Sequence, residues 1–292
     1  MERTWEVLYH YTSLDSFVNI IKSKKFRLYD VTKSNDPLEG SYMIHALEKA
    51  YQKLHDKEKI NDEEYALARQ TFFFFKEELI SQGRFNDFCG AASFCVPEHE
   101  LMMLRSYGNN GKGIALGVPI KALEMLANNN QQLIFKKVEY LSEQEIIDRA
   151  AGFWLRKIRF WQEKIPIIDE KTVAPFVREL NEYYYMSYFV KDKVNKDEEE
   201  YRLLYLSKDL FEIRLPGLGK TPHQDIDFIS VGDDLKAYYE IPVGNSDKDL
   251  FYFSDVISGP NCKATDREIQ TFLYCHGFQE CSVCKNSWVK MR

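Results

Sequence analysis

The stretch that decides the fold lies near the start of the chain and reads Tyr9-His10-Tyr11-Thr12-Ser13. Residues 5–11 are predicted to form a strand. Thr12 or Ser13 can cap a helix directly after it, because apolar residues then recur at helical spacing. Residues 26–31 predict a second strand. A histidine therefore lies at a strand end beside a helix start, at an edge of a sheet that can hold a small ligand.

The loop after the second strand is rich in acid and amide groups, with the sequence Asn35-Asp36-Pro37-Leu38-Glu39-Gly40. Pro37 disfavours helical geometry at Asp36, so a turn is expected here. The loop adds hydrogen-bonding side chains to the same region of the predicted sheet.

Farther along, strands and helices mix without a regular βαβα alternation. This order predicts an α+β fold with a mixed, mostly antiparallel sheet and flanking helices. The sequence has no internal repeat and no Gly/Ser linker, so residues 1–292 are predicted to form a single domain with a helical insertion at about 142–190. Further strands are expected at 90–96, 114–118, 132–140, 201–207, 227–231, 237–243, 255–258 and 278–284, and further helices at 39–54, 61–81, 98–107 and 265–276.

The composition is that of a globular protein, with 45% hydrophobic and 29% charged residues. No apolar run approaches the roughly 20 residues needed to span a bilayer, and residues 1–6 do not resemble a signal peptide. We therefore expect a cytoplasmic protein with no membrane partner. The net charge of −6 gives no overall attraction to a phosphate backbone, which leaves only a local basic patch for nucleic acid.

Six cysteines in 292 residues are too few for a disulfide scaffold, so reduced thiols are expected. Cys275-His276, Cys281 and Cys284 could suggest a zinc site, with Cys262 as a further ligand. Cys275 falls in a predicted helix, however, and a strand would point Cys281 and Cys284 to opposite faces. Structural thiols are the preferred interpretation, and no metal is expected.

Two segments carry side chains suited to chemistry on a nucleotide. In Glu198-Glu199-Glu200-Tyr201-Arg202 the carboxylates lead into a strand, where alternation puts Glu200 and Arg202 on one face. A carboxylate there can stabilise an oxocarbenium ion at a ribose, although such runs are usually solvated loops. Tyr107, before the turn 108–113, is either a core residue or a stacking surface for a planar ring.

Segments spread over most of the chain resemble a bacterial family known as domain of unknown function 2971. Leu104 is a departure, because the family commonly has tryptophan there. The segments that carry the resemblance are Tyr9–Thr12 with Ile20-Ile21, Phe26–Leu28, Asn35–Glu39, Phe94-Cys95, Leu104–Tyr107, Gly113–Leu116, Glu198–Arg202, Ile257–Pro260 and Ser287.

The start of the chain also resembles ADP-ribosyltransferases, including the DNA-modifying toxin group, which implies an ADP-ribosyltransferase-like fold. NAD would be the substrate, and the acceptor a protein or a nucleic acid. The resemblance implies that Glu200 drives transfer, with Glu198 completing a Glu-x-Glu pattern. The residues implied to bind NAD are His10, Thr12, Arg27 and Tyr107, and those implied to shape the rim are Asn35, Asp36 and Glu39.

The predicted function is therefore an NAD-consuming ADP-ribosyltransferase or NAD glycohydrolase-like effector in bacterial anti-phage defence or a toxin system. One alternative is a non-enzymatic ligand-binding or interaction module of a defence or regulatory system, in which the loop Asn35–Glu39 is structural and His10 and Glu200 lie far apart. Another is a metal-dependent nuclease, if Asp36, Glu39 and Glu200 converge in space.

Overall fold

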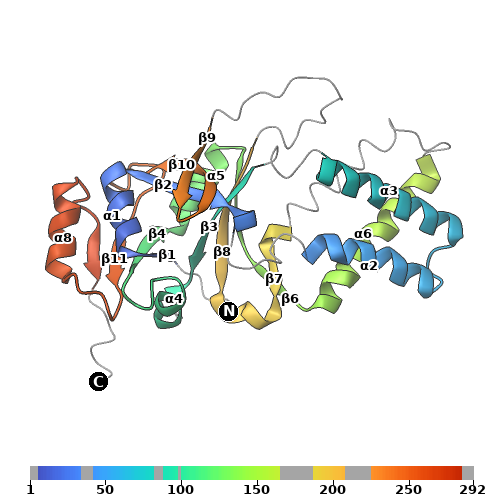
Figure 1. Cartoon of the computed structure of the whole chain (residues 1–292), viewed down its shortest axis with the longest axis horizontal. Coiled ribbons are helices and arrows are strands. Elements are labelled where there is room, and N and C mark those ends of the chain that lie inside the picture. The colour runs from blue at the N-terminus through green and yellow to red at the C-terminus, as the bar shows by residue number, and fades with distance from the viewer. Residues whose placement is uncertain are drawn as a thin grey trace.

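The computed structural model describes residues 6–33, 42–81, 88–97, 100–164, 187–207 and 225–284. A lobe built on a ten-stranded sheet carries most of the elements, and the helices α2, α3 and α6 form a second lobe beside it (Figure 1). Among the pairings described, only β11–β12 and β6–β7 are parallel. The predicted α+β fold with a mostly antiparallel sheet is confirmed.

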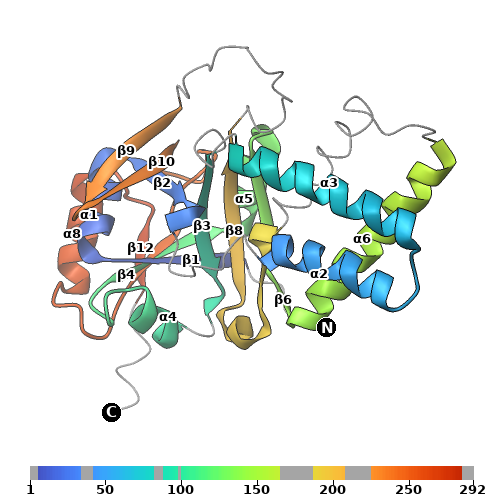
Figure 2. The same cartoon turned by 45° about the vertical axis from the view of Figure 1, so that its right-hand side comes forward.

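The sheet follows the order β12-β11-β4-β1-β3-β2-β10-β9, and β8 joins β3 to β5. β3 is its hub, because it pairs with β1, β2 and β8. Figure 2 shows β1 running at a steep angle to β3 and β8, so the sheet is curled. Buried apolar side chains of these strands pack together in one cluster. The strands are β1 Val7–Thr12, β2 Lys25–Asp30, β3 Cys89–Cys95, β4 Ile114–Pro119, β5 Leu133–Lys137, β6 Glu139–Leu141, β7 Val190–Asp192, β8 Glu200–Leu206, β9 Ile226–Val231, β10 Asp234–Pro242, β11 Asp255–Ser258 and β12 Ser282–Cys284.

At the starts of α1 and α8, side chains satisfy free N–H groups of the helix. Ser13 caps α1, accepting from the N–H of Ser16 at 3.1 Å, which confirms the helix start predicted after the first strand. Thr265 and Glu268 form a capping box at the start of α8. The helices are α1 Leu14–Ser23, α2 Tyr42–Asp56, α3 Asp62–Ser81, α4 Glu100–Ser106, α5 Ile120–Asn129, α6 Glu143–Lys164 and α8 Asp266–Cys275.

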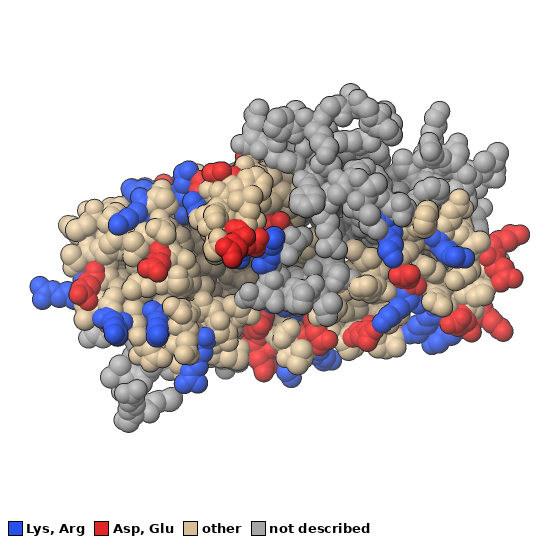
Figure 3. Space-filling view, in the orientation of Figure 1, with Lys and Arg blue, Asp and Glu red and all other residues tan. Residues whose placement is uncertain are grey.

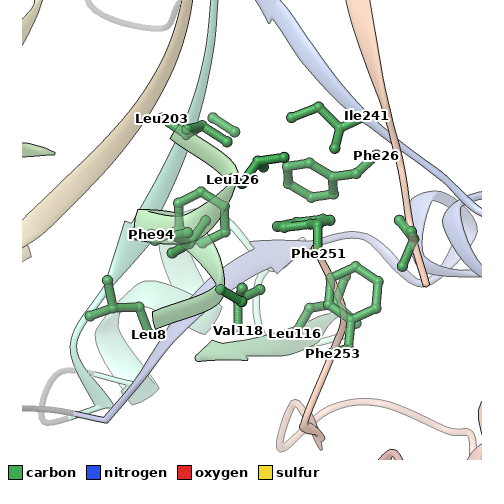
Figure 4. Close-up of a cluster of buried hydrophobic side chains, with 14 of the residues drawn as sticks. Leu8, Phe26, Phe94, Leu116, Val118, Leu126, Leu203, Ile241, Phe251 and Phe253 are labelled. Atoms are coloured by element: carbon green, nitrogen blue, oxygen red, sulfur yellow. The ribbon is translucent and has the colours of Figure 1, made fainter. Parts of the chain in front are cut away.

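An aromatic core fills the inside of the curled sheet (Figure 4). Phe26, Phe94 and Phe251 are at most 1% exposed, and Phe26 lies with its ring centroid 5.2 Å from that of Phe251. Each such side chain contributes about 1.5–3 kcal/mol by leaving water. We call this group the aromatic core. Its labelled members are Leu8, Phe26, Phe94, Leu116, Val118, Leu126, Leu203, Ile241, Phe251 and Phe253.

The helical lobe draws on two stretches of the chain. Trp154 of α6 is fully buried, and its indole N–H donates to the carbonyl of Leu47 in α2 at 2.9 Å. The predicted insertion at 142–190 corresponds to α6 over residues 143–164, whereas residues 165–186 lie outside the described part. The lobe therefore combines α6 with the earlier α2 and α3.

Two predicted segments differ in the structure. The many charged residues between 191 and 199 predict a loop, but the chain there forms β7, which begins at Val190, and the 3-10 helix Lys193–Glu198, which Asp192 caps. The expected strand 278–284 is ordered as a strand only over Ser282–Cys284, because Phe278 and Cys281 are buried in the apolar core beside α8. On the face shown in Figure 3, basic and acidic side chains are interspersed over both lobes.

None of the described helices is long and apolar enough to cross a membrane.

Candidate functional site

Two carboxylates and two cations form a buried group at the start of β8. Lys191 donates to Glu198 Oε2 and to Glu200 Oε2, each at 2.7 Å. Arg202 donates from Nε to Glu200 Oε1 at 2.5 Å and from Nη2 to Oε2 at 3.1 Å. The side chains of Glu200 and Arg202 are 2% and 3% exposed, so this pair is removed from water. We call Lys191, Glu198, Glu200 and Arg202 the charge cluster.

Glu200 is the most fully bound member of the charge cluster. Besides the two cations, the hydroxyl of Ser93 on β3 donates to Glu200 Oε1 at 2.5 Å. The backbone N–H of Glu200 donates to the hydroxyl of Tyr140 on β6 at 2.9 Å. Both carboxylate oxygens therefore accept two hydrogen bonds, which offsets the cost of burying the charge.

The cations keep Glu200 ionised despite its burial. Burial alone would raise the pKa of this carboxyl, but the charges of Arg202 and Lys191 lower it to about 2. Burial would lower the pKa of Lys191, and the Glu200 carboxylate instead raises it above its usual value. Burial and these carboxylates raise the pKa of Cys95, which pairs with Glu200 across the two strands. Glu200 and Lys191 are therefore both charged near neutral pH.

A left-handed residue brings the two carboxylates onto one ammonium group. Glu199 has φ of 40°, in the region that side chains other than glycine rarely adopt. This residue ends the 3-10 helix and is followed directly by β8. With this geometry at Glu199, the side chains of Glu198 and Glu200 both reach Lys191.

Tyr107 joins this site from the end of α4. Its hydroxyl donates to Glu198 Oε1 at 3.0 Å, while 41% of the residue remains exposed. Burial and the Glu198 carboxylate raise the pKa of the phenol. Tyr107 and Glu198 are therefore the members through which the site meets solvent, whereas Glu200 lies beneath them.

The turn after Tyr107 confirms the predicted helix stop. Asn109, Asn110 and Gly111 are all left-handed, and the carbonyl of Leu104 accepts from the N–H groups of Gly108 and Gly111.

Other segments of the resemblance lie against this turn. A Cβ on Gly113 would come 2.1 Å from the carbonyl oxygen of Thr12, and a Cβ on Gly259 would come 2.3 Å from that of Gly111. Both positions need glycine because backbones meet there. The end of β1 and the loop after β11 therefore support the turn that carries Tyr107, and Thr12 is placed beside this turn.

His10 lies on the opposite face of the sheet from the charge cluster. Its ring contacts Phe26 and Phe94 of the aromatic core, with centroids 4.9 and 5.8 Å away. Ring Nδ1 donates to the carbonyl of Ser93 at 3.0 Å, whereas the side chain of Ser93 points through to Glu200. Burial lowers the pKa of His10.

The prediction that His10 shares a cleft with Tyr107 and Glu200 needs correction. Consecutive side chains of β3 point to opposite faces of the sheet. Ser93 points to the face that carries Glu200, and Phe94 points to the face that carries His10. The order of residues along the chain could not reveal which face of the strand each one occupies.

Arg27 is engaged elsewhere, on β2. Its Nε donates to Glu240 at 3.1 Å, and its guanidinium lies 4.1 Å from the ring centroid of Tyr238. These contacts place it with β10 rather than with the charge cluster. The predicted rim residues Asn35, Asp36 and Glu39 lie outside the described residues.

Sequence analysis missed three members of this site. Ser93 lies in the predicted strand 90–96, where alternation gives a weak signal for its face. Lys191 lies among charged residues that predict a loop, so its position in the sequence gives only a weak signal for the site. Tyr140 had no signal, because its position depends on the pairing of β6 with β7.

The cysteines considered as zinc ligands have different surroundings. Cys281 is 1% exposed in the apolar core, where burial raises its pKa to about 12, and Cys275 is exposed on α8. Across the described part of the chain, no group of three or more His, Cys, Asp or Glu residues is arranged to hold a metal ion.

Of the comparisons made, the one with models of protein families gives a match. No curated protein and no solved structure is significantly similar to this chain, and the resemblance to ADP-ribosyltransferases gains no support. The resemblance to domain of unknown function 2971 is confirmed over part of the chain, which includes Tyr107 and all four residues of the charge cluster. The model of the family described as "Protein of unknown function (DUF2971)" matches residues 103–203.

Proposed function

We propose that this protein is an NAD-consuming enzyme, an ADP-ribosyltransferase or NAD glycohydrolase, that acts in the cytoplasm as an effector of anti-phage defence or of a toxin system. The observation that carries the proposal is the convergence of Tyr107, Glu198 and the paired Glu200 from separate elements. An aromatic ring beside a partly exposed carboxylate suits a planar, positively charged nicotinamide and the ribosyl cation that forms when it leaves.

The roles of the two glutamates follow from their exposure. The side chain of Glu198 is 17% exposed and that of Glu200 is 2% exposed. Glu198 is therefore the catalytic carboxylate in this proposal, and Glu200 positions Lys191 and Arg202 beneath it. His10 and Arg27 have no part in this site, whereas Asn35, Asp36 and Glu39 stay proposed as its rim.

The chemical step breaks the bond between the nicotinamide nitrogen and C1′ of its ribose. Nicotinamide leaves with the bonding electron pair and becomes neutral, and the positive charge moves to the ribose. The Glu198 carboxylate stabilises that charge. Water, in a glycohydrolase, or a nucleophilic group of the acceptor, in a transferase, then bonds to C1′ and gives its proton to Glu198 or to solvent.

The test is release of nicotinamide from NAD by the purified full-length chain, measured by chromatography with and without protein and nucleic-acid acceptors. Glu198→Gln should lower the rate at least ~10²-fold, as the loss of one electrostatic group does in other enzymes. Glu143→Gln is the matched control, because that side chain is 71% exposed on α6. It should retain the wild-type rate.

Two results would count against the enzyme. If the wild-type protein releases no nicotinamide under any of these conditions, the proposed activity is wrong. If Glu198→Gln releases it at the wild-type rate, the activity belongs to another site.

A second function is favoured by one observation, the neutral and fully paired state of the charge cluster. Glu200 and Arg202 make a closed pair, which suits a ligand-binding or interaction module in which nothing reacts. Such a module would gain thermal stability on adding NAD or a related nucleotide, by an amount that rises with the logarithm of the ligand concentration above Kd, without releasing nicotinamide.

A further inference from the structure

Lys191 has so far been described only as a partner of Glu198 and Glu200, with no role of its own in the proposed mechanism. It comes from β7, and its ammonium group lies 2.7 Å from both Glu198 Oε2 and Glu200 Oε2. Its side chain is 10% exposed, so the ammonium interacts with the carboxylates in a mostly water-free environment. The other oxygen of Glu198 accepts from Tyr107, so two donors from different elements hold this carboxylate.

Arg202 cannot replace Lys191 in this arrangement. Its Nε and Nη2 are bound to Glu200, and its Nη1 donates to the carbonyl of Tyr188 at 2.6 Å. The guanidinium therefore neutralises the buried glutamate. Among the contacts of the charge cluster described above, only Lys191 provides a cation that binds Glu198 directly.

We propose that Lys191 is the positioning residue of this site: its ammonium group bridges the two carboxylates, reduces the repulsion between them and holds Glu198 beside Tyr107. The proposal rests on the function proposed above and deepens it, because it assigns the control of the working pH range to one residue. Without Lys191, the Glu198 carboxylate would lie near the Glu200 carboxylate with Arg202 bound only to Glu200, and the repulsion would favour proton uptake by one of the two carboxylates.

The titratable and charged groups that face this bridge come from each neighbouring element. They are Cys95 of β3, Tyr107 after α4, Tyr140 of β6, Glu198 at the end of the 3-10 helix, and Glu200 and Arg202 of β8. The phenols and the thiol have pKa values raised above their usual range and stay neutral near pH 7. A titration near neutral pH after loss of Lys191 would therefore report the pair of carboxyl groups.

The experiment compares Lys191→Met with Lys191→Arg and with Lys193→Met. Lys193 is 60% exposed on the neighbouring 3-10 helix and reaches Glu145 only at 3.9 Å, so it serves as a matched control. The rate of nicotinamide release is measured from pH 4 to 9. Lys191→Met should move the acid limb of the profile upward by about 1–3 pH units, the size expected when a neighbouring opposite charge is lost. Lys191→Arg should restore the wild-type profile.

A second measurement separates this proposal from the proposed activity. Thermal unfolding of the same variants is followed over the same pH range, together with the double variant Lys191→Met with Glu198→Gln. The double variant keeps Glu200 and Arg202 as a neutral pair, so it should fold even where Lys191→Met does not. The pH dependence of thermal stability that Lys191→Met adds to that of the wild type should disappear in the double variant.

The outcomes are distinguishable. If the wild-type protein releases no nicotinamide but Lys191→Met gains a pH-dependent stability that Glu198→Gln removes, the activity is wrong and the bridge stands. If the acid limb of Lys191→Met coincides with that of the wild type, or if its pH-dependent stability persists in the double variant, Lys191 does not control Glu198 and the inference is overturned.

Discussion

The two faces of the sheet around β3 bury ionisable groups in opposite ways. On one face, His10 lies against Phe26 and Phe94, and burial lowers its pKa. On the other face, Glu200 lies among Arg202 and Lys191, which lower its pKa although burial raises it. One face thus keeps its group neutral by supplying rings, and the other keeps its group charged by supplying cations.

A single strand, β3, separates these two faces. Ser93 touches both, because its carbonyl accepts from His10 and its hydroxyl donates to Glu200. A strand can hold such different environments side by side because successive side chains alternate. The difference teaches that ionisable residues near each other in a sheet need not share a site.

Removing a cation from the charged face should have the largest effect. Arg202→Met leaves Glu200 buried with Lys191 as its remaining cation, and the loss of one partner of a buried ion pair costs about 3–5 kcal/mol of unfolding free energy. Urea unfolding measures this loss. Arg105→Met, at the exposed end of α4, is the control and should change stability by less than about 0.5 kcal/mol. A loss below about 1 kcal/mol for Arg202→Met would show that Lys191 and Ser93 suffice to hold the buried Glu200 carboxylate.

The charged face should also make the protein acid-sensitive. The pKa of Glu200 is about 2 in the folded protein against 4.5 for the free group, so the unfolded chain binds the proton more tightly. The stabilisation is complete above about pH 4.5 and is lost as pH falls towards 2, by about 3 kcal/mol in all. Glu200→Gln should remove this part of the pH dependence of unfolding.

Glu198→Gln is the comparison variant for that measurement. Its side chain is 17% exposed and its substitution should leave the steep loss of stability below pH 4.5 in place. If Glu200→Gln and the wild type have parallel stability curves in this range, the acid sensitivity arises elsewhere.

The apolar face should respond to acid at a higher pH than the charged face. Burial lowers the pKa of His10 below 6.5, so the unfolded chain binds a proton at this residue more tightly than the folded protein does. Stability should therefore fall as pH drops from about 6.5 towards the pKa of the folded protein. His10→Asn keeps a donor for the Ser93 carbonyl but cannot titrate. Its unfolding free energy should change less between pH 7 and 5 than that of the wild type, as judged by urea unfolding.

Sequence patterns predicted the local structure of this molecule better than its site. The capped helix after β1, the helix stop after Tyr107 and the strand that begins near Glu200 each depend on neighbours within a few residues, and the structure contains all three. The alternation that put Glu200 and Arg202 on one face is likewise local, and these residues form an ion pair.

The partners of those residues depend on the curl of the sheet, which no local pattern encodes. Placing His10 opposite Glu200 requires that β1 and β8 both flank β3, with Ser93 turned to one side and Phe94 to the other. Lys191 enters the site only because a short strand forms within a run of charged residues. Side chains such as Ser93 and Glu200, which meet through strand pairing although they lie far apart in the sequence, cannot be identified as partners from the order of residues.

The smallest effect is expected at the solvent edge of the charged face. Tyr107→Phe removes one hydrogen bond to the Glu198 carboxylate, and because 41% of the tyrosine is exposed, water can replace its hydroxyl. The expected loss of stability is about 0.5–1 kcal/mol, measured by urea unfolding against Tyr274→Phe, a tyrosine 62% exposed on α8. In the background of Glu198→Gln the loss should shrink, since the charged acceptor is then absent. An equal loss in both backgrounds would mean that Tyr107 is held by its ring rather than by Glu198, and the solvent edge would no longer belong to the charge cluster.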